Sequence, residues 1–300
     1  MSAPTLATTY DQFLADAAHL DRLRPHTLRA YRYELAAAAA DSRFAVPLET
    51  LPRAVLDAWL ARPPAASSTV GRRAATFNRF FHWALRQGHC TRNPLTGRVA
   101  IRARRGLPRP IQQAAEQRRL DAAIAAAPGD YRLIFTILRE TGMRASEVLA
   151  LRASDVTLDA GREALRVREP KNGLERVVIL GPTATPRTLR GLRVWRHAHP
   201  EAPPHEPLFR SNRGTILSYD ALHYQWAKLC VTAQLVDADG APRYTPHQLR
   251  HTRGSELLAQ GQRLEIVQRV LGHRDIRSTQ GYAELQDAHV RAALEDGHAR

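Results

Sequence analysis

The stretch TPHQLRHTRGSELLAQGQRLEIVQRVLGHRDIRSTQGY, residues 245–282, determines how the rest of the chain is interpreted. Thr245 followed by Pro246 predicts a helix start, because a hydroxyl residue caps a helix and proline is tolerated at its first position. Gly261 predicts the end of that helix. An apolar run over residues 264–271 predicts a second helix.

Side chains of this stretch suit chemistry at a phosphate. The three-residue spacing of His247 and Arg250 predicts that both project from one helix face, and Gly272 leaves His273 on the turn that follows. A guanidinium binds phosphate oxygens and keeps its charge. The phenol of Tyr282 can attack phosphorus covalently, but its pKa of about 10 means that cations or imidazoles must help to remove the proton. The set indicates phosphodiester cleavage by a tyrosine.

Ordinary alternatives exist for these residues. His247 and His251 are four apart and could pair on a metal, but Gln248 stands where the HExxH motif needs glutamate. A single histidine is usually a surface or satisfied core residue, and we interpret His251 in that way. Tyr282 by itself would usually be a packing aromatic, so only the combination favours catalysis.

Composition points to a nucleic-acid partner. The 300 residues suffice for two domains, and a net charge of +15 with a pI near 10.9 favours a polyanion. Two cysteines imply neither a disulfide framework nor a thiolate metal site. With no apolar run long enough for a bilayer and no signal segment, we expect no membrane association and a cytoplasmic protein. The chain has 42 arginines and two lysines, Lys171 and Lys228. Because a cation needed only for its charge would usually be arginine in this chain, each lysine suggests a further role.

The first 105 residues predict an all-helical unit with 16 arginines against 7 acids. The absence of acids close in sequence to residues 72–86 favours phosphate contacts over a merely solvated face. Apolar residues recur at helical spacing in four segments, residues 7–20, 28–40, 52–60 and 70–85. The candidate DNA-contacting residues are Thr27, Arg32, Arg72, Arg73 and Arg79.

A basic, Gly/Pro-rich segment, residues 102–110, predicts a linker to a second domain over residues 106–300. An apolar helix over residues 131–140 precedes Gly142, and a new helix follows with Arg144 near its start. In the ordinary alternative, Arg144 makes an ion pair with a nearby glutamate, Glu147 or Glu140.

Between residues 156 and 180 the apolar period changes to that of strands. Residues 156–158, 165–167 and 177–179 predict short strands, and Asn172-Gly173 is a strong hairpin signal. Lys171 lies beside that turn, where a flexible ammonium could reach a DNA groove.

These motifs resemble the tyrosine recombinases, a family that includes phage integrases and Xer-type recombinases. The resemblance is carried by TGMRASEVLAL at residues 141–151, EPKNGLER at 169–176, HQLRH at 247–251, LGH at 271–273 and Tyr282. TLRAYRYEL from Thr27 and the pair Asn93-Pro94 resemble the family's core-binding domain more loosely. The resemblance implies two domains, mainly α: an all-helical core-binding domain over residues 1–105, and an α+β catalytic domain with a small antiparallel sheet.

The resemblance also implies a mechanism. Tyr282 would attack the scissile phosphate to give a 3′-phosphotyrosyl link and a free 5′-hydroxyl, while Arg144 and Arg250 clamp the non-bridging oxygens. Lys171 would protonate the leaving 5′-oxygen. The two histidines would assist: His247 in proton transfer from the tyrosine, and His273 as a hydrogen-bond donor to phosphate. Because the covalent link retains the phosphoester energy, no cofactor, metal or ATP is expected.

Double-stranded DNA is the expected partner, with a tetramer assembled on paired sites. The tail, residues 283–300, is expected to dock on a neighbouring subunit in that assembly and on its own domain in the free monomer. Two alternatives stay open: a type IB topoisomerase, which would share the nucleophile, and a catalytically silent DNA-binding regulator.

Overall fold

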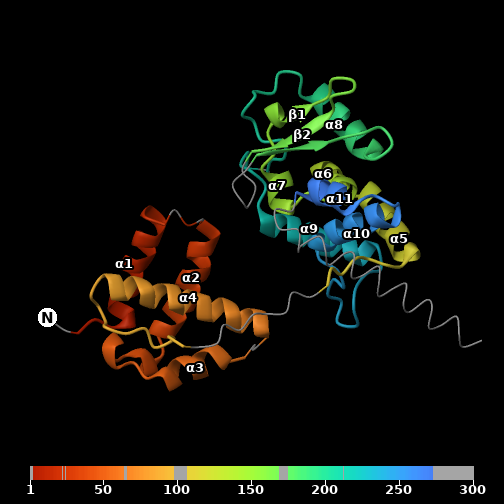
Figure 1. Ribbon diagram of the computed structural model, residues 1–300. Helices are drawn as coiled ribbons and strands as arrows, with labels where there is room; N and C mark the ends of the chain where they lie inside the picture. Colours follow the sequence, from red (N-terminus) through yellow and green to blue (C-terminus); the bar gives the residue numbers. More distant parts are fainter. Residues whose placement is uncertain are drawn as a thin grey trace, which may run out of the picture. The chain divides into compact units, whose positions relative to one another are not determined.

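The computed structural model describes residues 3–21, 23, 25–63, 66–97, 107–168, 175–211 and 213–272. The chain divides into two compact units, residues 1–105 and 106–300 (Figure 1). The described part of the first is helical, and that of the second combines helices with a small antiparallel sheet. This confirms the predicted mainly α fold class. None of the helices in the described ranges combines the length and apolarity needed to cross a bilayer.

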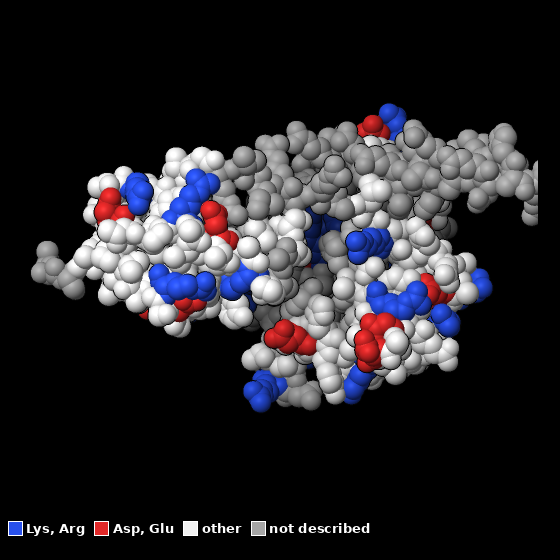
Figure 2. All heavy atoms as spheres, turned by 90° about the horizontal axis from the view of Figure 1, so that it is seen from below, with Lys and Arg blue, Asp and Glu red and all other residues white. Residues whose placement is uncertain are grey.

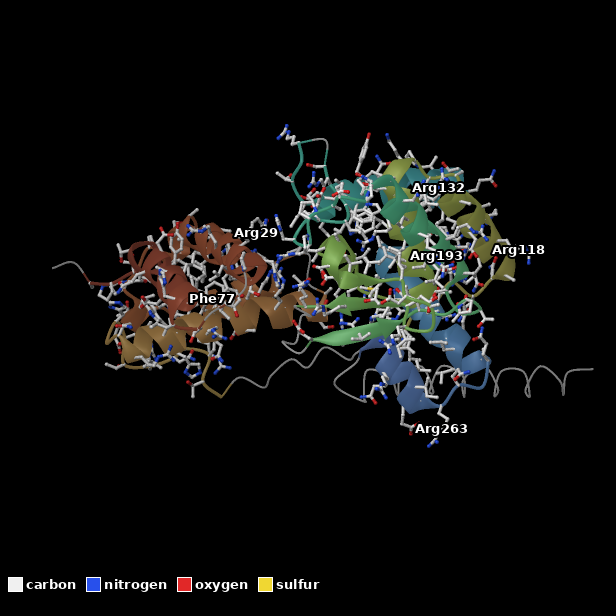
Figure 3. All side chains as sticks on the ribbon, turned by 90° about the horizontal axis from the view of Figure 1, so that it is seen from above. Arg29, Phe77, Arg118, Arg132, Arg193 and Arg263 are labelled. Atoms are coloured by element: carbon white, nitrogen blue, oxygen red, sulfur yellow. The ribbon has the colours of Figure 1, made fainter. Side chains whose placement is uncertain are left out.

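The N-terminal unit is built around an aromatic core. Phe77 on the longest of its described helices has no exposed surface and stacks on Phe44 at 6.0 Å between ring centroids, while Phe13 meets Phe80 edge-on at 5.6 Å. Figure 3 shows Phe77 among the helices, whereas Arg29 projects from the surface. The helices are α1 (Leu6–His19), α2 (Pro25–Ala39), α3 (Arg53–Ala61) and α4 (Ser67–Arg86), with short 3₁₀ turns at Ser42–Phe44 and Leu48–Thr50.

Helix α2 begins earlier than the sequence predicted. The predicted helical segment starts at residue 28, but Pro25 is the first residue of the helix. Proline fits there because the first helical N–H groups have no partner within the helix and the ring presets φ.

Helix α6 lies at the centre of the second unit, and its buried residues include Ile134, Phe135 and Leu138. It packs against α5, α7, α8 and α10 (Figure 1). The helices of this unit in the described ranges are α5 (Ala114–Ala125), α6 (Gly129–Thr141), α7 (Ala145–Leu149), α8 (Pro186–Ala198), α9 (Tyr219–Thr232), α10 (Pro246–Ala259) and α11 (Leu264–Leu271). The predicted ends of α10 and α11 are confirmed. Helix α5 was not predicted, although its buried Leu120 and Ile124 have helical spacing.

The three predicted strands are present as a sheet in the order β1-β2-β3, with both pairs antiparallel. The strands are β1 (Val156–Thr157), β2 (Ala164–Val167) and β3 (Arg176–Ile179). Val178 faces the core, while Val177 and Ile179 on either side of it are exposed. The predicted Asn172-Gly173 turn lies outside the described residues.

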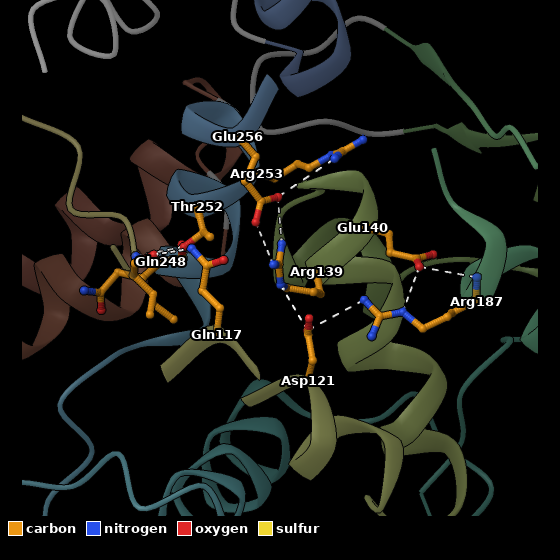
Figure 4. Close-up of polar contacts among 10 residues, drawn as sticks. Gln117, Asp121, Arg139, Glu140, Arg187, Gln248, Thr252, Arg253 and Glu256 are labelled. Atoms are coloured by element: carbon orange, nitrogen blue, oxygen red, sulfur yellow. Dashed lines mark hydrogen bonds and ion pairs between the residues drawn. The ribbon is translucent and has the colours of Figure 1, made fainter. Parts of the chain in front are cut away.

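Ion pairs fix α10 to its neighbours (Figure 4). Arg139 of α6 donates to both carboxylate oxygens of Glu256 on α10, at 2.9 and 2.6 Å, and to Asp121 of α5 at 3.2 Å. In addition, the backbone N–H of Ile111 donates to the Thr252 hydroxyl of α10 at 2.9 Å. Because bidentate pairs of this kind are directional, the part-buried pair of Arg139 and Glu256 helps to set the orientation of α10 on α6.

Candidate active site

Arg250 joins the ends of two helices. It is 2% exposed, and its Nη1 and Nη2 groups donate to the carbonyl oxygens of Gly142 at 2.7 Å and Leu271 at 2.6 Å. Gly142 caps the C-terminus of α6, and Leu271 is the last residue of α11. Carbonyls at helix C-termini lack intrahelical partners and carry partial negative charge, so a guanidinium is well matched to both.

Two glycines permit this close approach. Gly142 and Gly272 have φ of 67° and 66°, in the left-handed region that side chains disfavour. A Cβ on Gly142 would also lie 2.7 Å from Leu271 Cδ2. Glycine at position 142 therefore favours the meeting of the ends of α6 and α11 at Arg250, which a side chain there would strain.

Arg144 caps the N-terminus of α7 and pairs with Glu147. Its Nη1 group donates to Glu147 Oε1 at 2.9 Å, and its backbone N–H donates to Oε2 at 3.0 Å. The predicted ion pair with Glu147 therefore exists, whereas Glu140 accepts hydrogen bonds from Arg187. A guanidinium has five N–H donors, so pairing through Nη1 is compatible with a phosphate contact.

Glu147 also binds Arg176, which the sequence did not single out. Arg176 donates Nη1 to Oε1 at 2.8 Å and Nη2 to Oε2 at 2.7 Å. Burial alone would raise the pKa of Glu147, but the hydrogen bonds and charge of Arg176 and the hydrogen bonds from Arg144 outweigh it and lower the pKa to about 2. Glu147 could have been found from its place three residues after Arg144, where a carboxylate satisfies helix N-terminal amides. No local signal marked Arg176.

His247 and Arg250, three residues apart on α10, differ in exposure, which their spacing does not predict. Arg250 is buried, whereas His247 is exposed. The ring of His251, half-buried, meets that of His247 edge-to-face with centroids 4.8 Å apart. Burial, with the positive charges of His247 and Arg250, lowers the pKa of His251 to about 4, so this ring is neutral at neutral pH. Gln248 stands where the HExxH metal motif would need glutamate. Its Oε1 accepts the Thr245 N–H at 2.6 Å and caps α10.

The structure thus brings the α6–α7 corner, with Arg144, against α10, with His247 and Arg250. The other predicted catalytic residues, Lys171, His273 and Tyr282, lie outside the described residues.

In the N-terminal unit the structure corrects one candidate DNA contact. Arg73 is 4% exposed and donates to the backbone carbonyls of Arg62 at 2.5 Å and Leu60 at 3.3 Å. Its guanidinium also lies 3.7 Å from the buried Glu34. Because the charge of Arg73 is thus paired with a carboxylate that is itself buried, the structure contradicts the predicted phosphate contact.

The other basic candidates are at the surface, but acids distant in sequence pair with them. Arg32 pairs with Asp11 at 2.8 Å, Arg79 with Asp21 at 2.9 Å, and Arg72 with Glu34 at 3.1 Å. The expectation that no acids compensate α4 was therefore wrong: they are distant in sequence but adjacent in space. Figure 2 shows acidic groups beside several of the blue basic groups. Thr27 is half-buried in the first turn of α2.

The fold and site together define a class of protein. Arg144 lies at the N-terminus of α7, and Arg250, on the same helix as His247, donates to carbonyls at the ends of α6 and α11. Such a cationic cluster is suited to stabilising charge on a phosphodiester, and the net charge of +15 suits DNA. These features are those of an enzyme that cleaves and rejoins DNA strands.

Comparison with known proteins gives the family. The sequence profile of the Phage integrase family matches residues 111–289. Tyrosine recombinase XerC of Mycobacterium sp. (strain KMS) is 35% identical over 308 aligned positions, which cover 97% of this chain and 97% of the relative. The chain belongs to the phage integrase family of tyrosine recombinases, which cleave and rejoin DNA at specific sites. These matches agree with the predicted recombinase and not with the topoisomerase or regulator.

Solved structures of low sequence identity share the fold. The lambda integrase dimer bound to a COC′ core site superposes with a TM-score of 0.73 and 21% identity, covering 93% of this chain and 95% of that one. The lambda integrase tetramer bound to a Holliday junction gives 0.68 and 22%, covering 91% and 78%.

The low pKa of Glu147 makes a stability prediction. A fall from 4.5 to about 2 corresponds to about 3 kcal/mol. Because folding lowers this pKa, the contribution is complete above the unfolded value and is lost as the pH falls toward 2. Glu147→Gln should therefore lower the free energy of unfolding by about 2–3 kcal/mol at pH 7, measured by urea denaturation, and by steadily less from about pH 5 downward. Glu201→Gln, at an exposed site, is the control; an equal loss at all pH values would contradict the prediction.

Proposed function

We propose that the chain performs site-specific recombination through Tyr282, which attacks the scissile phosphate and leaves a 3′-phosphotyrosyl link and a 5′-hydroxyl. The observation that carries the proposal is the bridge from Arg250 to Gly142 and Leu271. It joins α10, which carries His247, to Gly142, two residues before Arg144, and to Leu271 at the end of α11.

In this proposal Arg144 and Arg250 stabilise negative charge on the non-bridging oxygens as the phosphoryl transition state forms. His247, exposed on α10, assists removal of the tyrosine proton. The neighbouring His251 supports that role. Its ring is neutral, so it adds no positive charge that would disfavour proton uptake by His247. No step needs a cofactor.

Lys171 and His273 take the remaining roles. Lys171 protonates the leaving 5′-oxygen, and His273 donates a hydrogen bond to the phosphate. Support comes from their places in the EPKNGLER and LGH motifs, and from the scarcity of lysine in a chain with 42 arginines. An ammonium can transfer a proton at ordinary pH, which a guanidinium does not.

Tyr282→Phe should bind DNA with unchanged affinity but form no covalent adduct, because the nucleophilic oxygen is lost. The measurement is a denaturing gel of protein incubated with a labelled site, with Tyr224→Phe, an exposed tyrosine on α9, as the matched control. A protein–DNA band from Tyr282→Phe would show that another residue is the nucleophile.

Lys171→Arg should slow cleavage by roughly 100-fold or more although charge is preserved, since general acid catalysis typically contributes about 10²–10⁴-fold. A substrate with sulfur at the bridging 5′ position, whose leaving group needs no proton, should restore the rate. Lys228→Arg serves as the control lysine. If the sulfur substrate gives no rescue, Lys171 positions DNA and is not the acid.

The proposed domain roles follow the two units. Residues 1–105 form a core-binding domain that contacts DNA through Thr27, Arg32, Arg72 and Arg79, and residues 106–300 form the catalytic domain. The support is the exposure of the three arginines. DNA as the substrate would place the protein in the cytoplasm.

We further propose a tetramer on paired sites. Lambda integrase, which shares the fold, forms a tetramer on a Holliday junction. The tail, residues 283–300, would dock on the neighbouring subunit. Support for an acceptor is a hollow near β3, α10 and α11, lined by polar residues and by apolar ones that include Val178, Ile179, Leu257, Ile266 and Val270.

Deletion from Asp287 onward should leave binding to a single site nearly unchanged but abolish cooperative assembly of paired sites. Native gels with one-site and two-site DNA measure both. A truncated protein that still forms tetramers and recombines at the wild-type rate would rule out tail exchange.

A further inference from the structure

Arg176 connects three parts of the site that are distant in sequence. It is the first residue of β3 and pairs with Val167 across the sheet. Side chains along a strand alternate, so Arg176 lies on the same face as the buried Val178 and Leu180. Its guanidinium therefore points into the unit, toward α7, and not toward solvent.

The guanidinium of Arg176 and the N–H groups of Arg144 donate to the same two carboxylate oxygens of Glu147. Two parallel hydrogen bonds of 2.8 and 2.7 Å form a fork, with the side chains of Arg176 and Glu147 only 15% and 2% exposed. The fork fixes the carboxylate in position and in rotation. The carboxylate in turn receives both the Nη1 group and the backbone N–H of Arg144.

Arg176 also touches the end of α11. A Cβ placed on Gly272 would lie 2.7 Å from Cδ and 2.7 Å from Cζ of Arg176. The glycine thus makes room for the guanidinium, and the two are packed in direct contact. The Nε atom of Arg176 is buried and has no hydrogen-bond partner among the described residues, so the fork to Glu147 is its principal polar anchor.

Charge sharing gives this arrangement a consequence. A single Glu147 paired only with Arg144 would neutralise the guanidinium that must bind phosphate. Since Arg176 shares the carboxylate, a net positive charge remains on the trio. A fixed carboxylate also restricts the rotamers of Arg144, which lowers the entropy lost when the phosphate arrives.

We propose that Arg176 is a positioning residue for DNA cleavage, which acts on Arg144 through their shared partner Glu147. This rests on the proposed role of Arg144 at the phosphate. It predicts that Arg176 and Arg144 are energetically coupled in the cleavage step, whereas Arg176 and Lys171 are not, although Arg176 and Lys171 belong to the same EPKNGLER segment.

The test is a double-mutant cycle on single-turnover cleavage. The full-length protein is incubated with a nicked suicide DNA, whose cleaved product accumulates so that slow rates stay measurable. Arg176→Lys keeps the charge but loses the fork, and should slow cleavage roughly tenfold to hundredfold, since a misplaced catalytic group can cost about that much. Arg166→Lys, on the neighbouring strand with its side chain 47% exposed, is the matched control and should cleave at the wild-type rate.

The same change is then made in two backgrounds. In the Arg144→Ala background, Arg176→Lys should slow cleavage by less than about twofold, because the residue that Arg176 positions is gone. In the Lys171→Arg background, Arg176→Lys should still slow cleavage roughly tenfold to hundredfold. A full factor in both backgrounds would overturn the proposal, as would wild-type cleavage by Arg176→Lys. If Arg144→Ala alone cleaves normally, the proposed function of Arg144 fails instead.

Stability is separated from positioning by a second variant. Glu147→Asp shortens the carboxylate and opens the fork while Arg176 stays in place, and should show the same coupling to Arg144. Thermal melting and single-site DNA binding of every variant identify loss of fold. Reduced cleavage that follows only the melting temperature, with no coupling to Arg144, would show that Arg176 is merely structural.

Discussion

The second unit depends on the contacts of the buried guanidinium of Arg250. An unpaired charge inside a protein is strongly unfavourable, and so is a buried carbonyl without a donor. Here the guanidinium of Arg250 donates to the carbonyls of Gly142 and Leu271, so the buried charge gains acceptors and both carbonyls gain a donor. Removing Arg250 would leave both helix ends unsatisfied, so the residue proposed to bind phosphate also holds its own site together.

The acids near the site have a similar double effect. Glu147 restrains Arg144 without cancelling its charge, because Arg176 shares it. Glu140 accepts the backbone N–H groups of Arg187 and Thr188 at the start of α8, where a helix favours negative charge. These carboxylates organise cations and helix ends, and the described contacts give neither of them a role as a base.

Much of this organisation could be predicted from the sequence where the signal was local. Glycine and proline marked the ends of α10 and α11, and the ordered motifs identified the family. Contacts between elements could not be predicted in this way. Helical spacing placed His247 with Arg250 but could not say that only Arg250 is buried, since burial depends on what packs against α10. Arg176 and Glu147 are 29 positions apart, and only the folded sheet brings them together.

The acid partners of the surface arginines would also affect how DNA binding depends on ionic strength. Each of Arg32, Arg72 and Arg79 already holds a carboxylate. An arginine that exchanges this carboxylate for a phosphate releases fewer condensed counterions in net terms, because the freed acid attracts cations of its own. The ionic-strength dependence of binding would then be shallower than the number of arginines suggests. The same acids would restrain these arginine side chains before DNA binds. Binding would then replace a carboxylate by a phosphate and would order few additional side chains.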